Sequence, residues 1–309
     1  MRRIHLDTDL GGDTDDLCAL AMLLGWPGVE LVGITTSADR QGLRAGLTEY
    51  ALRLVGRSDI PVVAGAAGSL SGFRVPAGVS DVNRYWPEPI APEPASPGAA
   101  LDLLARSIAV GATVVAIGPY TNLALLEAAS PRLLASVEVV LMGGYVTPIR
   151  PGLPNWGPNM DYNVQQDTLA ARIVFEHCNP VLVQLPVTLE VTLCMAHLPR
   201  LRACGPLGNL LATQAELHGA DSAMPKLGRE HAGLPDDLLN FQYDPLACAV
   251  AAGWDGVRIE EMPLVASLKD RLLTFLVDPT GKMTRVVTAV DGKRFARDWL
   301  EAVTHAAQA

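Results

Sequence analysis

The chain has 309 residues, 49% of them hydrophobic, so it is long enough to bury a large apolar core without stabilising cross-links. It carries 33 Asp and Glu against 24 Lys and Arg, a net charge of −9, which argues against binding nucleic acid or an anionic membrane through a general field. A small neutral or cationic ligand fits this balance better.

Cysteine usage and the N-terminus both point to the cytoplasm. The five cysteines are scattered and form no CxxC pair, so neither a disulfide framework nor a zinc site is indicated. After two arginines, the first apolar run is broken by His5 and Asp7, before a signal-peptide core could form. The uncharged stretch 107–126 is long enough for a membrane span, but its Gly and Pro residues favour a strand, a turn and a helix.

Strand-like and helix-like patterns alternate along the first two thirds of the chain. The expected strands are 2–9, 29–36, 60–65, 112–118, 137–144 and 179–186, and the expected helices lie near 15–25, 41–56, 98–110, 121–129 and 167–178. Such alternation produces βαβ units. We therefore expect the α/β class, with a single open, mostly parallel twisted sheet and helices on both faces.

The last third is less regular. It contains a helix near 206–218, a polar stretch 219–240, a helix from Asp244, small additional strands at 257–266, 272–278 and 284–290, and a last helix from about 292. Residues 66–97 are rich in Gly and Pro, and since βα units continue on both sides they are expected to form a long functional loop rather than a linker. One domain, 1–309, is predicted.

Five aspartates crowd into the stretch "DTDLGGDTDD" at 7–16. Asp13 or Thr14 could cap the first helix, and Asp15 and Asp16 would suit its first turn. Helix capping does not explain Asp7 and Asp9 on the strand side of the turn. Carboxylates at about 6 Å repel by about 3 kcal/mol at an effective dielectric of about 20, and a hard cation such as Ca²⁺ or Mg²⁺ would remove that cost.

A remote partner for this cluster is the stretch "YDPLACA" at 243–249. Asp244 followed by Pro245 is typical of a helix N-cap with Pro at the first helical position. Because the carboxyl ends of parallel strands meet at one edge of the sheet, the turns after Asp9, Thr36, Ile117 and Gly144 are expected to converge there.

In four spaced motifs the sequence resembles the inosine-uridine-preferring nucleoside hydrolases, over nearly the whole chain. The motifs are "DTDLGGDTDDLCAL", "AIGPYTNLALLEAASP", "NWGPNMDYNVQQDTLAA" and "YDPLACA", and the first has two extra residues inside the turn. The resemblance implies the family's Rossmann-like fold and Ca²⁺-dependent hydrolysis of the N-glycosidic bond of a ribonucleoside. It also suggests a homo-oligomer, either a dimer or a tetramer.

Residue roles follow from the resemblance by position. Asp9 and Asp15 would be catalytic, with Asp9 the general base and Asp15 holding ribose hydroxyls as well. The implied metal set is Asp9, Asp15, Asp16, Asp244 and the backbone carbonyl of Ile117. Ribose binding would use Asp15, Asn155, Asp161 and Asn163, although turn formation is an alternative role for the two asparagines. Asp13 lies in the insertion, and the alignment leaves open whether it or Asp15 faces the ribose.

The departures from the family pattern lie around the base. Tyr243 stands where the family has a histidine, "SDVNRYW" at 80–86 replaces the stretch with a second histidine, and Arg40 replaces an asparagine. Expected contacts to the base or leaving group are Tyr243, Arg40, Arg229, His231 and Asp236. Arg40 could instead be a solvated helix-start residue, and His231 an ordinary surface histidine.

Two other functions remain open at this point. A haloacid-dehalogenase-like Mg²⁺ phosphatase also begins with a DxD motif after its first strand, and "PDD" at 235–237 could imitate its late acidic motif. A non-catalytic nucleoside or ribose binder could retain the metal site. The altered base positions predict that an active hydrolase here takes a modified or unusual nucleoside.

Overall fold

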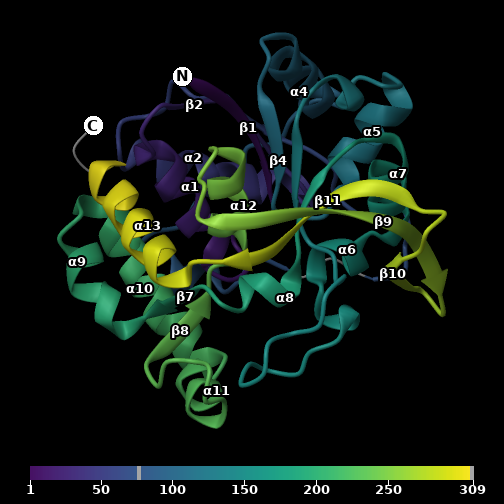
Figure 1. Cartoon of the computed structure of the whole chain (residues 1–309). Helices are drawn as coiled ribbons and strands as arrows, with labels where there is room; N and C mark the ends of the chain where they lie inside the picture. The colour runs from purple at the N-terminus through teal and green to yellow at the C-terminus, as the bar shows by residue number, and fades with distance from the viewer. Residues whose placement is uncertain (75–77, 307–309) are drawn as a thin grey trace.

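The computed structural model describes residues 1–74 and 78–306 (Figure 1). Its central feature is a nine-stranded sheet in the order β10-β9-β11-β6-β5-β4-β1-β2-β3. The strands are β1 (Arg2–Thr8), β2 (Val29–Thr36), β3 (Val62–Ala64), β4 (Thr113–Ala116), β5 (Val139–Met142), β6 (Val181–Val183), β9 (Val257–Lys269), β10 (Leu272–Val277) and β11 (Lys282–Val290).

The sheet is parallel over most of its width and antiparallel at one edge. Strands β1 to β6 pair in parallel, and β11 joins β6 in parallel register. Strands β9 and β10 continue the sheet in antiparallel pairs. The mostly parallel sheet and the three small C-terminal strands are confirmed.

Helices cover both faces of the sheet (Figure 1). One core packs α1 (Asp15–Gly25), α2 (Leu43–Arg53), α10 (Gly205–Asp221), α12 (Tyr243–Ala251) and α13 (Gly292–Ala306) against one face. The opposite core contains α4 (Ala99–Ala109), α5 (Thr121–Ala129) and α7 (Thr168–His177). This layering buries the near-continuous apolar strands that a parallel sheet requires.

Along β1, successive side chains point alternately to the two faces of the sheet and so into the two cores. Ile4 and Leu6 belong to the α1 side, whereas His5 is fully buried toward α4. The His5 ring nitrogens hydrogen-bond Ser107 Oγ at 2.8 Å and Thr35 Oγ1 at 3.0 Å. Burial lowers the pKa of His5 to about 3, so this histidine is a neutral core residue.

The irregular last third contains elements that the sequence pattern did not predict. β7 (Thr192–Cys194) and β8 (Leu238–Phe241) form a separate antiparallel ribbon, and α11 (Met224–Glu230) lies within the polar stretch. α12 begins at Tyr243 with Gln242 as its N-cap, so Asp244 lies in the first turn rather than at the cap.

The remaining elements are short. They are α3 (Val82–Tyr85), α6 (Tyr162–Gln166), α8 (Leu185–Thr188), α9 (Leu198–Arg202) and four 3₁₀ turns at Arg40–Gly42, Leu134–Ser136, Pro158–Met160 and Met195–His197. The loop expected at 66–97 contains α3, and its residues 75–77 lie outside the described part. Within the described ranges, no helix is long and apolar enough to cross a membrane.

Candidate active site at the carboxyl edge of the sheet

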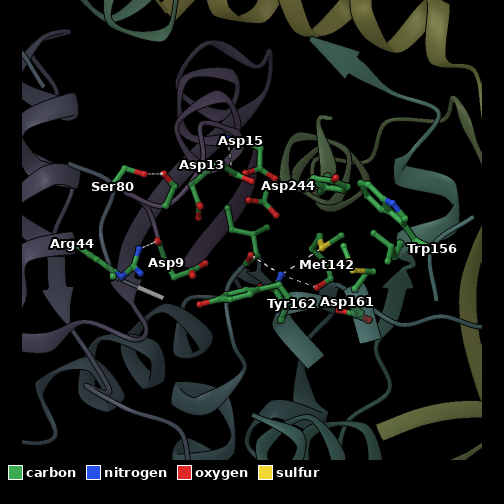
Figure 2. A pocket seen from close by; sticks show the side chains of 18 residues that line it. Asp9, Asp13, Asp15, Arg44, Ser80, Met142, Trp156, Asp161, Tyr162 and Asp244 are labelled. Atoms are coloured by element: carbon green, nitrogen blue, oxygen red, sulfur yellow. Dashed lines mark hydrogen bonds between the residues drawn. The ribbon is translucent and has the colours of Figure 1, made fainter. Parts of the chain in front are cut away.

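A cavity of about 430 Å³ opens where the turns after the parallel strands meet (Figure 2). Its described lining includes residues from each of the four motifs, together with others. They are Asp9, Gly12, Asp13, Asp15, Asp16, Arg44, Gly78, Ser80, Ile117, Met142, Trp156, Met160, Asp161, Tyr162, Asn163, Leu185, Tyr243 and Asp244. The turns after Asp9, Ile117 and Gly144 thus meet here as predicted, whereas the turn after Thr36 supplies no lining residue and Arg44 of α2 lies on that side instead.

The turn from β1 into α1 supplies four of the carboxylates. Gly11 adopts a φ of +111°, and a Cβ there would approach Leu47 Cδ1 to 2.7 Å, so only glycine suits this turn. Asp13, Asp15 and Asp16 each offer one oxygen, and these oxygens lie within 4.8 Å of one another. Thr14 occupies the N-cap position of α1 but makes no side-chain capping bond.

Asp16 and Asp244 lie far apart in the sequence but belong to the same acidic cluster. Asp16 accepts a hydrogen bond from Thr8 Oγ1 and is buried at the start of α1. Asp244 is buried in the first turn of α12, and its carboxylate accepts no hydrogen bond from the described residues. Burial raises the pKa of both carboxyl groups well above the usual range, and mutual repulsion within the cluster raises it further.

Asp9 lies just beyond β1, directly beside the turn that follows β4. A Cβ on Gly118 would meet Asp9 Oδ1 at 2.8 Å, so glycine at this position lets the two turns approach. Burial raises the pKa of Asp9 to about 6, with the Arg44 charge opposing that shift and the Asp13 charge adding to it. A carboxyl group with this pKa can exchange protons near neutral pH.

The oxygen-rich lining fits a hard divalent cation. All five positions of the implied metal set, including Ile117, line the cavity, and Asp13 joins them. Asp15 and Asp244 are both largely buried in the fold, and both line the cavity. Carboxylate and carbonyl oxygens are the ligands that Ca²⁺ and Mg²⁺ prefer.

Two of the predicted ribose residues lie on the opposite wall. Asn163 Nδ2 donates to the carbonyl oxygens of Ile117, at 2.8 Å, and of Met142, at 3.1 Å. Asp161 caps α6 by accepting from Val164 N at 3.2 Å, and its other oxygen accepts from Gly144 N. Burial raises the pKa of Asp161 to about 6.

Several predicted contacts lie elsewhere. Asn155 is exposed and does not line the cavity, while its neighbour Trp156 does. Arg40, Arg229 and Asp236 are exposed, and they too are absent from the lining. His231, also outside the lining, bonds the Leu227 carbonyl through Nδ1 at 3.0 Å. Of the predicted base contacts, only Tyr243 faces the cavity.

The cationic side chain at the cavity is Arg44, which the sequence pattern did not single out. Its guanidinium donates to the carbonyl oxygen of Asp9 (Figure 2) and to those of Leu10 and Ala38, each at 3.1 Å. Asp39 accepts from the backbone N–H of Arg44 and of Ala45, each at 3.0 Å, and so fixes the start of α2. A lone arginine inside a helical pattern carries no sequence signal for this role.

Loop residues close one side of the cavity. Ser80 binds the inserted turn twice, because its N–H donates to Gly11 O at 2.8 Å and its hydroxyl donates to Gly12 O. Tyr85, at the end of α3, donates its hydroxyl to Asp221 Oδ2 on α10 at 2.9 Å. The stretch "SDVNRYW" thus holds the loop against the acidic turn.

The fold and the cavity together define an α/β protein with an acidic small-molecule site at the carboxyl edge of a parallel sheet. A family model described as inosine-uridine preferring nucleoside hydrolase matches residues 4–297. The pyrimidine-specific ribonucleoside hydrolase RihA of Salmonella agona is 34% identical over 220 residues, which cover 68% of each chain. The enzyme of that name from Klebsiella pneumoniae is 33% identical over 269 residues, 83% of this chain and 84% of its own.

Solved structures share the fold. A plant nucleoside hydrolase superposes with a TM-score of 0.79 at 22% identity, over 98% of this chain and 99% of its own. A purine-preferring ribonucleoside hydrolase from Gardnerella vaginalis gives a TM-score of 0.79 at 24% identity, over 99% of each chain. The chain belongs to the inosine-uridine preferring nucleoside hydrolase family, and it is therefore an N-ribohydrolase rather than a phosphatase.

Proposed function

We propose that the protein hydrolyses the N-glycosidic bond of a ribonucleoside with an unusual base, in a Ca²⁺-dependent reaction, giving free base and ribose. The observation that carries this proposal is the convergence of the whole implied metal set with Asp161 and Asn163 around one cavity. The family assignment supports the bond that is cleaved, and the all-oxygen lining supports the type of cation.

Asp9, Asp15, Asp16, Asp244 and the Ile117 carbonyl would hold the cation. When bound, Ca²⁺ would supply positive charge that acidifies a water molecule and orients the ribose hydroxyls. Asp15, Asp161 and Asn163 are the proposed ribose contacts that line the cavity. Asn155 remains a prediction, since its side chain is exposed in this structure.

Asp9 is the proposed general base. Its carboxylate takes a proton from water as the water oxygen bonds to C1′ and the C1′–N bond breaks with its electron pair passing to the base. The base then takes up a proton from solvent, and Asp9 returns its proton to solvent. The transition state resembles an oxocarbenium ion, so the surrounding carboxylates stabilise the positive charge that develops on the sugar.

We also propose one domain, cytoplasmic location and a homo-oligomer. The single sheet that joins strands from both ends of the chain supports the first, and five free, buried cysteines support a reducing compartment. Only family resemblance supports the oligomer.

A nucleoside panel tests the function. Protein in Ca²⁺ is incubated with each nucleoside and the free base is measured by mass spectrometry, alongside Asp9→Asn. The proposal expects base release by the wild type and a loss of at least about 100-fold in the variant, as for removal of a general base. Binding of an intact nucleoside with no base release over hours would instead favour the non-catalytic alternative.

A further inference from the structure

The cavity extends along the carboxyl edge of the sheet, and its two ends differ in chemistry. The neighbouring strands β1, β4, β5 and β6 place Asp9 at one end and Leu185 at the other, with Ile117 and Met142 between them. At about 4.8 Å per strand, the two ends lie about 14 Å apart. In Figure 2, Asp9 lies on one side of this space and Trp156 on the other.

The proposed reaction sets the direction of the sugar in this cavity. C1′ must lie beside Asp9, which takes the proton of the water that attacks C1′. The 2′ and 3′ hydroxyls, which are a neighbouring pair, face the proposed cation site at Ile117, and C4′ is bonded to C3′ on the side away from C1′. The substituent on C5′ therefore extends toward β5 and β6.

The described residues at the β5–β6 end of the cavity are mainly apolar. They include Met142 at the end of β5, Leu185 after β6, and Trp156 and Met160 on the loop that follows β5. Trp156 packs on the buried Phe241, with ring centroids 5.5 Å apart. Such a wall favours contact with carbon and sulfur atoms, and a hydroxyl group buried against it without a partner costs free energy.

The polar side chains near this end already have other contacts or point elsewhere. Both oxygens of Asp161 accept hydrogen bonds from backbone N–H groups, and Asn163 Nδ2 donates to two backbone carbonyls. Asn155 is exposed and does not line the cavity. The ring of Tyr162 extends toward Asp9 (Figure 2). A hydroxyl group on C5′ would therefore be poorly matched by the described residues around it.

We propose that the preferred substrates are ribonucleosides without a 5′-hydroxyl group, which carry either hydrogen or a small apolar group such as methylthio on C5′. This inference rests on the proposed function and names its substrate class. The cleavage step is unchanged: the C1′–N bond breaks, water supplies the hydroxyl on C1′, and the C5′ substituent stays on the released sugar. The products are the free base and a 5-deoxyribose or 5-methylthioribose.

Kinetics with matched pairs of nucleosides test the proposal. The pairs are 5′-deoxyuridine with uridine and 5′-deoxy-5′-methylthioadenosine with adenosine, so the base is the same within each pair. The first member should have a kcat/KM at least about tenfold higher, because it leaves no hydroxyl group unpaired in the cavity. Met160→Gln, which adds an amide to the wall at a half-exposed position, should lower this ratio about fivefold. The matched control Met195→Gln, at an exposed methionine outside the cavity lining, should leave the ratio unchanged.

Binding provides a second readout that does not depend on turnover. Pseudouridine and its 5′-deoxy derivative have a carbon–carbon glycosidic bond that this mechanism does not cleave, and calorimetry in Ca²⁺ should give a Kd at least about tenfold lower for the deoxy compound. Equal or weaker binding of the deoxy compound, or a kcat/KM ratio that Met160→Gln leaves unchanged, overturns the 5′-substituent preference, while cleavage of uridine or adenosine leaves the hydrolase function standing. Absence of cleavage of every nucleoside in Ca²⁺ overturns both.

Discussion

Replacing Asp16 with Asn separates what the acidic cluster does for the fold from what it does for function. Asp16 is 5% exposed, accepts the Thr8 hydroxyl, and has an oxygen within 4.8 Å of oxygens of Asp13 and Asp15. Asn has the same shape and can still accept from Thr8. The substitution therefore removes a charge and preserves the packing.

The expected effects on stability and function are opposite in sign. Two ionised carboxylates at this separation repel by about 3.5 kcal/mol at an effective dielectric of about 20. Burial raises the pKa of Asp16 and so opposes its ionisation, which makes the gain on removing its charge smaller, on the order of 2 kcal/mol. In EDTA, Asp16→Asn should melt about 3 °C higher than the wild type.

Thermal melting in EDTA and across a Ca²⁺ titration measures the first effect, and nucleoside cleavage measures the second. Ca²⁺ should raise the Tm of the wild type and of the exposed Asp102→Asn control equally, but hardly that of Asp16→Asn, which should also lose activity. An Asp16→Asn protein that melts lower in EDTA yet keeps full stabilisation by Ca²⁺ would refute this reasoning.

Three further predictions concern buried charged groups. Asp167→Asn should lower stability by about 3 kcal/mol in thermal melting, because Asp167 is fully buried and accepts bonds from Leu70 N, Ser71 N, Thr121 Oγ1 and Ala170 N. Arg44→Met should lower the free energy of unfolding by a similar amount and reduce kcat/KM, because three backbone carbonyls would lose the hydrogen bonds that Arg44 donates. An unchanged Tm would contradict this structural role of Arg44. The pKa of Asp9 is raised to about 6 in the folded state, so the stability that Asp9 contributes is present below about pH 4 and lost as the pH rises through 6. The loss is on the order of 3 kcal/mol. Melting in EDTA from pH 4 to 8 should show this decline in stability, and Ca²⁺ should remove most of the decline.

The parallel sheet and the place of the site were predictable because both depend on strong, repeated signals. Apolar β-branched runs such as 112–118 and 137–144 can be buried on both faces only in a parallel sheet. Once the strands are parallel, Asp9, Ile117 and the turn after Gly144 must share an edge. Asp244 could be assigned to the same site from its motif, but the prediction that it is the N-cap of its helix was wrong, because Gln242 holds that position.

What the sequence did not show depends on tertiary packing. The short strands β7 and β8 have too few residues for a periodic signal, and they pair only because distant segments bring them together. Arg44 acquires its role from carbonyls on two other loops, and Trp156 rather than Asn155 faces the cavity because of the path of an irregular loop. Composition cannot specify such directions.

The most direct test of the central claim is the fate of oxygen during cleavage in ¹⁸O-labelled water. With Ca²⁺ present, the account predicts one labelled oxygen in the released ribose, none in the free base, and loss of the reaction in EDTA or in Asp9→Asn. Label-free ribose, or cleavage that persists unchanged in both EDTA and Asp9→Asn, would contradict hydrolysis by a water molecule at this acidic site.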